Sequence, residues 1–231
     1  MSVLTIKPSV ATLGATVTGA KLNKLSASYW STIEAAFNEH GVLVFPDQHL
    51  STAEQIDFGR RFGEIAIEAS YISNLLPDGS VRAPDEAMMK TLRGNEYWHT
   101  DSSFMPLAAK VSILSAHQVP DSGGETEWAD MRAAYDALDD GTRSRMAGLK
   151  AYHSVLHAQS RLGQSAEETA RMLAELTARH DDEEDTENDK KPVATYPTEP
   201  PLRPLVKVHP ATSPTITVRR TSRLRHSRPH R

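Results

Sequence analysis

The chain changes character after Gly163, and this change limits how much of it can form a packed core. Seven of the nine residues 181–189 are acidic, and the stretch 192–204 contains five prolines. Residues 203–231 contain no acid and eight lysines or arginines. Such segments bury too little apolar surface to offset the entropy cost of folding, and proline excludes a central strand. The expected organisation is one domain over 1–212, an acidic and proline-rich insert at about 181–204, and a disordered basic tail over 213–231.

The composition excludes several classes of partner and site. Of the 231 residues, 39% are hydrophobic, which is enough for one sizeable core, and the formal net charge of -4 creates no field that attracts nucleic acid or a membrane surface. The absence of cysteine excludes disulfides and thiolate metal sites, and leaves histidine, aspartate and glutamate as metal ligands. No apolar run reaches the roughly 20 residues of a membrane helix. We expect a soluble cytoplasmic protein with no membrane partner and no specific nucleic-acid partner.

Short apolar segments separated by turn residues dominate the first part of the chain. Strand patterns are rich in β-branched residues, whereas helix patterns repeat every three or four residues and begin at serine or threonine caps. The expected strands are 3–6, 15–17, 41–45, 71–76, 97–104, 111–119 and 126–129. The expected helices are 28–39, 52–62, 131–138 and 167–178. This order favours a mainly β fold with flanking helices, a sandwich or jelly roll, over a doubly wound sheet.

The sequence Trp98-His-Thr-Asp101 points most directly to chemistry. On a strand, residues two apart project to the same face, so His99 and Asp101 can place an imidazole nitrogen and a carboxylate oxygen on one metal ion. These are two members of the two-histidine, one-carboxylate triad that binds Fe(II) and leaves positions open for substrate and oxygen. A His-x-Asp triplet also arises by chance, so the surrounding sequence is needed to judge whether this one binds a metal.

The surrounding sequence contains an ordered series of motifs. Before the triplet lie Gly41-Val-Leu-Val-Phe45 and Phe58-Gly-Arg-Arg-Phe-Gly63. After it come Ser103-Phe104, Leu114-Ser-Ala116, Ser122-Gly-Gly-Glu-Thr126, Asp130-Met-Arg-Ala-Ala-Tyr135, Gly148-Leu-Lys-Ala-Tyr-His153 and Ser160-Arg-Leu-Gly163. Together these segments closely resemble the TauD/TfdA family of taurine and phenoxyacetate-herbicide dioxygenases. The resemblance covers most of residues 1–163.

The resemblance implies a double-stranded β-helix, or jelly roll, that holds Fe(II) and uses α-ketoglutarate and O2 as cosubstrates. In that family the keto acid becomes succinate and carbon dioxide while a substrate is hydroxylated. By position, His99 and Asp101 match the first two iron ligands. Thr126 matches a threonine that binds a carboxylate of the keto acid, and Asn95 matches a position that lines the substrate pocket. The implied substrate is a small anionic molecule of the sulfonate or aryloxyalkanoate type.

Several of these residues also have a purely structural interpretation. Thr126 could end the preceding glycine turn, and Asn95 could be an ordinary turn residue. Trp98 is expected to pack in the core beside the metal strand. His153 and His157 have metal-binding spacing for a helix but match no ligand of the family, so we assign them a structural or surface role.

The rest of the expected metal site is not found in the sequence. The family supplies a distal histidine, in a segment rich in Trp, Asp and Asn, and then an arginine for the far carboxylate of α-ketoglutarate, whereas the last tryptophan here is Trp128. His209 matches a family position outside the triad, and His226 and His230 lie in the basic tail, so none is assigned as third ligand. We expect a jelly roll that is incomplete at the C-terminus, as in a truncated or frame-shifted gene product, and weak binding of α-ketoglutarate.

Three functions follow from these observations and stay open. The first is an Fe(II)- and α-ketoglutarate-dependent dioxygenase that hydroxylates a small anionic organic substrate and releases succinate and CO2. The second is a catalytically inactive, truncated remnant of that family. The third, which we favour least, is a binding protein that uses its basic tail. Homo-oligomerisation is left open in all three.

Overall fold

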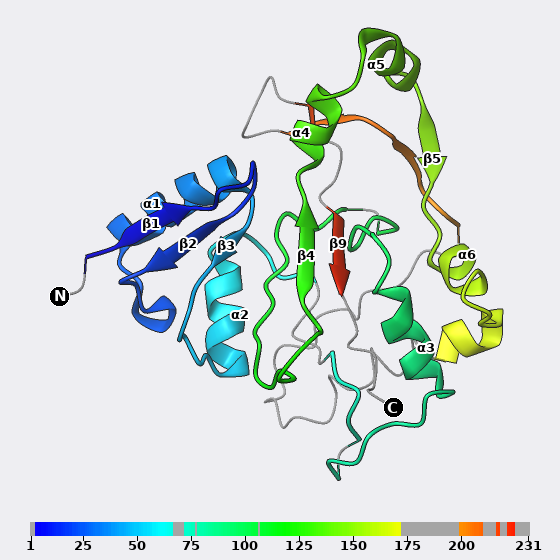
Figure 1. The fold of residues 1–231 in the computed structure, drawn as a ribbon, viewed down its shortest axis with the longest axis horizontal. Coiled ribbons are helices and arrows are strands. Elements are labelled where there is room, and N and C mark those ends of the chain that lie inside the picture. Colours follow the sequence, from blue (N-terminus) through cyan, green and yellow to red (C-terminus); the bar gives the residue numbers. More distant parts are fainter. Residues whose placement is uncertain are drawn as a thin grey trace.

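The structure of the chain is a computed structural model, which describes residues 3–66, 72–76, 78–105, 107–171, 199–209, 216–217 and 221–224. Figure 1 shows the elements of the first 60 residues, coloured blue to cyan, gathered at one end of the molecule. Helices and short paired strands of the later chain make up the rest of the ribbon. The candidate site belongs to this second part.

The N-terminal sheet has the strand order β1-β2-β3. Strands β1 (Thr5–Pro8) and β2 (Ala15–Thr18) are antiparallel, and Gly14 in the connecting turn has a φ of 99°, which favours glycine. Strand β3 (Leu43–Val44) pairs in parallel with β2, after a helical crossover. The three strands predicted before residue 50 are therefore confirmed, although β3 is short and Val44 is 55% exposed.

Two capped helices pack beside this sheet. Helix α1 (Ala27–His40) begins where the Ser26 hydroxyl accepts a hydrogen bond from the Tyr29 N–H, and it ends at Gly41, whose φ of 75° is left-handed. A 3-10 turn, η1 (Leu22–Lys24), precedes it. Helix α2 (Thr52–Arg60) has a capping box, in which Ser51 and Glu54 bind each other's backbone N–H groups. Both predicted helices are confirmed.

The main hydrophobic core lies within this N-terminal part. Its buried members come from β2, the turns, α1 and α2, and they are Val17, Ala20, Leu22, Leu25, Ile33, Leu50 and Phe58. Aromatic rings extend it, with the centroids of Trp30 and Phe62 only 4.8 Å apart in an edge-to-face arrangement. From the later chain, Ile113 packs against the core, and its carbonyl accepts a hydrogen bond from the Gln55 side chain at 3.2 Å. Ile113 thus connects the later chain, which contains the candidate site, to the N-terminal core.

The later chain alternates short helices and strands. The helices are α3 (Ala87–Gly94), α4 (Met131–Asp136), α5 (Asp140–Met146) and α6 (Val155–Ser160). The strands are β4 (Thr126–Ala129), β5 (Lys150–Tyr152), β6 (Leu202–Pro204), β7 (Lys207–Val208), β8 (Ile216–Thr217) and β9 (Thr221–Leu224). They form three antiparallel pairs, β4-β9, β5-β6 and β7-β8, and Figure 1 shows β4 and β9 side by side in the middle of the molecule.

The mainly β expectation holds only in a coarser form. The described strands make one three-stranded and three two-stranded sheets, a mixed arrangement of helices and few strands in which no closed barrel is present. The strand predicted at 126–129 and the helix predicted at 131–138 are confirmed as β4 and α4. The two-stranded β5-β6 pair agrees with the expectation that the proline-rich stretch forms no central strand.

Two predicted strands are wrong. Residues 111–119 form no strand, and the Ile113 carbonyl accepts a hydrogen bond from the Gln55 side chain instead of from a neighbouring strand. Residues 97–104 form turns around a single bridge position, and Ser102 interrupts the extended chain with a left-handed φ of 54°. Within 71–76, the described residues contain only an isolated bridge, between Leu75 and Val81.

Two short strands lie within the stretch that was predicted to be a basic tail. Strand β9 lies within it and pairs with β4, so that Trp128 faces Ser222, and β8 pairs with β7. Ladder hydrogen bonds come from the backbone, so a segment with few apolar residues can still pair with an open strand edge. The rest of the tail, the acidic run 181–189 and most of the predicted helix 167–178 lie outside the described residues. The division into a domain over 1–212 and a tail stays a prediction.

Arg132, which forms a partly buried ion pair with Asp130 at the start of α4, joins α4 to the end of α1. The Arg132 guanidinium lies 3.3 Å from Asp130 Oδ1 and donates to the carbonyls of Glu39, at 3.2 Å, and Asn38, at 3.4 Å. Asp130 is also the N-cap of α4. Burial works to raise the pKa of Asp130, but the hydrogen bonds and charge of Arg132 outweigh it and lower the pKa. Arg132 therefore links the N-terminal part to the later chain.

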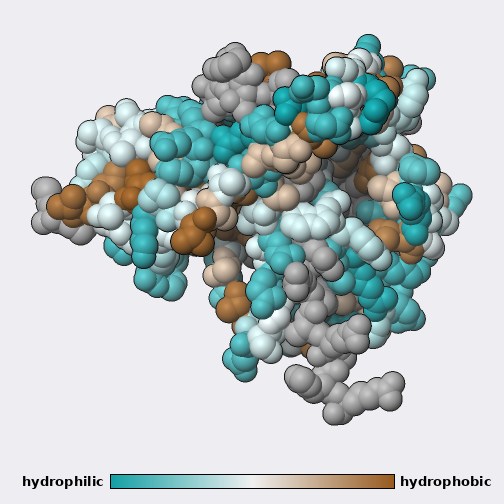
Figure 2. Space-filling view, turned by 45° about the horizontal axis from the view of Figure 1, so that its top comes forward, coloured by the Kyte–Doolittle hydropathy of each residue, from teal (hydrophilic) through white to brown (hydrophobic). Residues whose placement is uncertain are grey.

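Hydrophobic side chains on the surface are dispersed. Figure 2 shows brown hydrophobic residues in several separate small areas of that face, between larger hydrophilic areas. The most exposed large ones include Val10, Leu107 and Tyr152. Among the described residues, no helix has the length and hydropathy required to cross a membrane.

Candidate metal centre

His99 and Asp101 lie together just after the end of α3. The distance between His99 Nε2 and Asp101 Oδ1 is 3.2 Å, and the two side chains are 29% and 56% exposed. The pair was predicted on a strand, but it is formed by a turn, in which both side chains still reach one point. The structure thus brings together the two residues that the sequence singled out, by a different local geometry.

A backbone carbonyl fixes the orientation of the His99 ring. His99 Nδ1 lies 2.8 Å from the carbonyl oxygen of Tyr97, which can only accept, so Nδ1 carries the proton of this hydrogen bond. This leaves Nε2 to face Asp101. The hydrogen bond to the Asp101 carboxylate raises the pKa of His99, against the effect of burial, and the bond to Tyr97 adds to the rise. A backbone-held imidazole is the usual arrangement of metal-binding histidines.

Asp101 is held by His99 and by a residue that the sequence did not single out. Its pKa is lowered, first by the hydrogen bond from His99, against burial, and further by a hydrogen bond from the Ser112 hydroxyl. Ser112 is the single polar residue in the apolar run 111–114, and this is the sequence signal that could have identified it as part of the site. The turn after Asp101 closes with a 3.1 Å bond from the Met105 N–H to the Ser102 carbonyl, and Arg203 of β6 donates to the Met105 carbonyl.

The other predicted site residues are not brought into contact with this pair. Asn95 is the C-cap of α3, and its N–H bonds back to the Thr91 and Leu92 carbonyls. Thr126 begins β4 opposite Leu224. Within the described part of the chain, no hydrogen bond joins Asn95 or Thr126 to the His99–Asp101 pair, so their roles stay predictions.

Trp98 differs from one expectation, and no described histidine joins His99 and Asp101 in a group of three possible metal ligands. Trp98 was expected to pack in the core but is 48% exposed, because the turn after α3 directs it outward. His157 is exposed on α6, in keeping with a surface role. His209 follows β7, whereas His226 and His230 lie outside the described residues.

The donor atoms of the pair fit a metal ion in type and spacing. Two ligand atoms about 2.1 Å from a metal and at right angles to each other lie about 3.0 Å apart, which is close to the observed separation. Imidazole nitrogen and carboxylate oxygen are ligands of non-haem Fe(II). In the described ranges no group of three His, Cys, Asp or Glu side chains that could hold a metal ion is present. The pair therefore fits as part of a metal site and does not complete one by itself.

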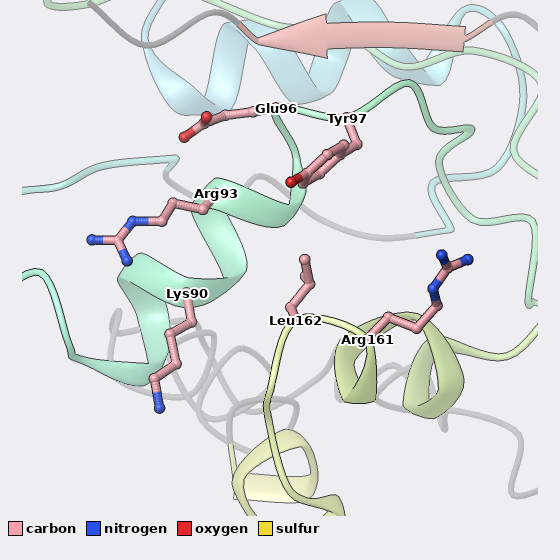
Figure 3. A pocket seen from close by; sticks show the side chains of 6 residues that line it. All are labelled: Lys90, Arg93, Glu96, Tyr97, Arg161 and Leu162. Atoms are coloured by element: carbon pink, nitrogen blue, oxygen red, sulfur yellow. The ribbon is translucent and has the colours of Figure 1, made fainter. Parts of the chain in front are cut away.

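A cavity lies between the end of α3 and the turn after α6, and Tyr97, whose carbonyl binds His99, is one of its lining residues. Its volume is about 340 Å³, and it is lined by Lys90, Arg93, Glu96, Tyr97, Arg161 and Leu162. Figure 3 shows Tyr97 and Leu162 between the guanidinium groups of Arg93 and Arg161, which point away from each other. The lining contains three basic side chains and one acidic one, so its formal net charge is positive.

The opposite pKa shifts of His99 and Asp101 predict a range of pH in which their ion pair stabilises the metal-free protein. The raised pKa of His99 means that its contribution is complete below about 6.5 and is lost as the pH rises through the folded-state pKa. The lowered pKa of Asp101 means that its contribution is present above about 3.9 and is lost as the pH falls through the folded-state pKa. The Tm difference between wild type and Asp101→Asn should thus be largest between about pH 4 and 6.5.

Thermal unfolding of both proteins across pH 3 to 9, in the presence of a chelator, measures this window. His157→Ala, which changes an exposed histidine, serves as the control and should show no such window. A Tm difference that grows steadily toward high pH would show that the pair does not stabilise the fold through its charges.

Comparison with known proteins gives a consistent result. The model of the family "Taurine catabolism dioxygenase TauD, TfdA family" matches residues 5–231. An (S)-phenoxypropionate/alpha-ketoglutarate-dioxygenase of Sphingobium herbicidovorans is 46% identical over 209 residues, which cover 90% of this chain and 67% of that protein. A protein of the same description from Delftia acidovorans is 42% identical over 217 residues, which cover 90% of this chain and 68% of its own length. The chain spans about two thirds of these relatives.

A solved structure also resembles the chain. The crystal structure of AAD-2 in complex with Mn(II) and N-oxalylglycine superimposes with a TM-score of 0.75 at 28% sequence identity. The superposition covers 97% of this chain and 91% of that one. The similarity in sequence and the similarity in fold therefore point to the same group of proteins.

Proposed function

The chain belongs to the taurine catabolism dioxygenase TauD, TfdA family of α-ketoglutarate-dependent dioxygenases, and we propose that it oxidises an aryloxyalkanoate anion of the phenoxypropionate type. The observation that carries the proposal is the His99–Asp101 pair, with donor atoms 3.2 Å apart, in a chain 46% identical to a phenoxypropionate dioxygenase. The finer description of the fold, a double-stranded β-helix or jelly roll, is part of the same proposal.

We assign the iron-binding role to His99 and Asp101. The Tyr97 carbonyl keeps the proton of His99 on Nδ1, so that Nε2 can act as a ligand, and Ser112 orients the Asp101 carboxylate. When bound, Fe(II) with α-ketoglutarate supplies oxidation by O2, with release of succinate and CO2. Thr126 is proposed to bind a carboxylate of the keto acid, on the family match alone. A structural relative that holds Mn(II) together with N-oxalylglycine, an α-ketoglutarate analogue, supports this pairing of ligands.

The proposed substrate is a small aromatic ether acid. Its carboxylate is matched by the positive balance of the cavity, and its ring by Tyr97 and Leu162, which lie between the two arginines. Asn95, at the start of the turn that leads to His99, is not among the residues that line this cavity, and its role in the substrate pocket is proposed on the family match alone. Hydroxylation of the carbon between the ether oxygen and the carboxylate gives a hemiketal, which separates into a phenol and pyruvate.

Product analysis with purified protein, Fe(II), α-ketoglutarate and O2 tests the proposal. (S)-2-phenoxypropionate should yield phenol and succinate in equal amounts, and taurine should yield little succinate. Succinate formation with taurine but not with the aryloxy acid would overturn the substrate class. The control without α-ketoglutarate should form no phenol.

A second candidate function is a catalytically inactive member of the family. It is favoured by one observation, namely that the described ranges offer no third protein ligand beside His99 and Asp101. An inactive member would bind metal through these two residues but would form no succinate with any acid tested. Metal titration next to the product assay therefore separates the two candidates.

A further inference from the structure

The turn after α6 packs against α3, although the two segments are far apart in the sequence. The buried Gln164, only 4% exposed, donates from Nε2 to the Thr91 hydroxyl at 3.1 Å. Lys90 Nζ of α3 lies 3.5 Å from Glu168 Oε1. Thr169, 1% exposed, and Leu92 of α3, 7% exposed, are buried in the same region. The segment that resembles the family at Ser160-Arg-Leu-Gly163 thus forms one packed unit with α3.

Leu162 and Gly94 lie close together in this unit. A Cβ atom placed on Gly94 would lie 2.5 Å from Leu162 Cδ1, nearer than side-chain atoms normally come. Figure 3 shows Leu162 pointing toward the turn that leaves α3. At Gly148, by contrast, an added Cβ would meet nothing within 4 Å. Glycine at position 94 therefore allows the Leu162 side chain to rest directly on the last residue of α3.

Two successive hydrogen bonds connect Gly94 to His99. The Tyr97 N–H donates to the Gly94 carbonyl at 3.3 Å, and the Tyr97 carbonyl accepts from His99 Nδ1 at 2.8 Å. The position of the His99 ring therefore depends on where the end of α3 lies. Leu162 contacts that end from the side and, with Tyr97, also lines the cavity.

From this chain of contacts we infer that Leu162 is a positioning residue for the His99–Asp101 pair. It acts through Gly94 and Tyr97 and touches neither ligand. This inference rests on the proposed function for its consequence in metal binding, but its structural part concerns the metal-free protein. Shortening Leu162 to alanine leaves a gap over Gly94, and the end of α3 gains freedom to move into it.

The metal-free protein provides the first test. Leu162→Ala should shift and broaden the imidazole proton–nitrogen correlations of His99, which are identified by their loss in His99→Gln, because Nδ1 no longer keeps one hydrogen bond. Leu156→Ala, at a leucine of α6 that is 39% exposed, is the matched control and should leave these signals unchanged. Unchanged His99 signals in folded Leu162→Ala would overturn the inference without affecting the proposed function.

Rescue by refilling the gap provides the second test. Leu162→Ala should weaken Mn(II) binding about tenfold, within the range seen when groups that orient metal ligands are removed. The double variant Gly94→Ala/Leu162→Ala places a methyl group 2.5 Å from the position of Leu162 Cδ1, inside the gap, and should recover most of the lost affinity. Equal affinities in Leu162→Ala and wild type, or no recovery in the double variant while Leu162→Met binds normally, would overturn the inference. Failure of the wild type to bind Mn(II) would instead defeat the proposed metal site.

Discussion

Replacing His99 or Asp101 by alanine is expected to lower the affinity for Mn(II) by more than about 100-fold, because the loss of a group that only orients a ligand already costs about 10- to 100-fold. Each variant removes one of the two donor atoms that lie 3.2 Å apart. Described residues nearby offer no third His, Asp or Glu to replace them. Titration with Mn(II), followed by the electron paramagnetic resonance signal of the free ion, measures the effect.

Two further variants make this titration specific. His157→Ala removes an exposed histidine and should bind Mn(II) as the wild type does. Ser112→Ala removes only the hydroxyl group that hydrogen-bonds Asp101, so it should fall between the wild type and Asp101→Ala. If His99→Ala and Asp101→Ala both bind Mn(II) with unchanged affinity, the metal site lies elsewhere.

The second large effect concerns stability. Arg132→Met should lower the free energy of unfolding by roughly 3 kcal/mol, because it removes the only charge paired with Asp130 among the described residues and leaves that carboxylate, 8% exposed, with its N-cap hydrogen bonds alone. It also removes the donor for the Asn38 and Glu39 carbonyls at the end of α1. Urea unfolding monitored by circular dichroism gives the value.

A double variant separates the charge from the packing. Asp130→Asn keeps an N-cap for α4 while removing the charge, so Asp130→Asn/Arg132→Met should be more stable than Arg132→Met alone. Arg60→Met breaks an exposed pair with Asp57 and should cost less than about 1 kcal/mol. Should Arg132→Met cost no more than Arg60→Met, the pair does not link α4 to α1 in solution.

Local signals in the sequence were sufficient to predict the helices of the N-terminal part. Ser26, Gly41 and the Ser51–Glu54 pair mark helix ends whose chemistry involves neighbours three or four residues away, so the bounds of α1 and α2 could be predicted. The core behind them follows from helical spacing, with Ile33 at 0% exposure.

Long-range pairing could not be predicted in the same way. The segment 111–119 has strand composition, but whether it pairs depends on a neighbouring backbone that composition does not specify. The tail offered the opposite case, because β9 has no apolar pattern and pairs through backbone atoms with β4. Both cases concern contacts between residues that are distant in the sequence.

The candidate site shows the same difference between residues that local sequence identifies and residues that only the fold brings together. His99 and Asp101 were found because they are two residues apart and match a family motif, and the structure places their side chains together. The Tyr97 carbonyl, Ser112 and Leu162 act through the folded backbone or across long separations, and no spacing rule identifies such groups.

Anaerobic absorption spectroscopy tests the central claim most directly, namely that this chain holds Fe(II) and α-ketoglutarate at the His99–Asp101 pair. Addition of both to the wild-type protein should produce the visible charge-transfer absorption of a keto acid bound to iron. The same addition to His99→Ala should produce none. Folded wild-type protein without this absorption at saturating Fe(II) and α-ketoglutarate, or equal absorption in His99→Ala, would contradict the claim.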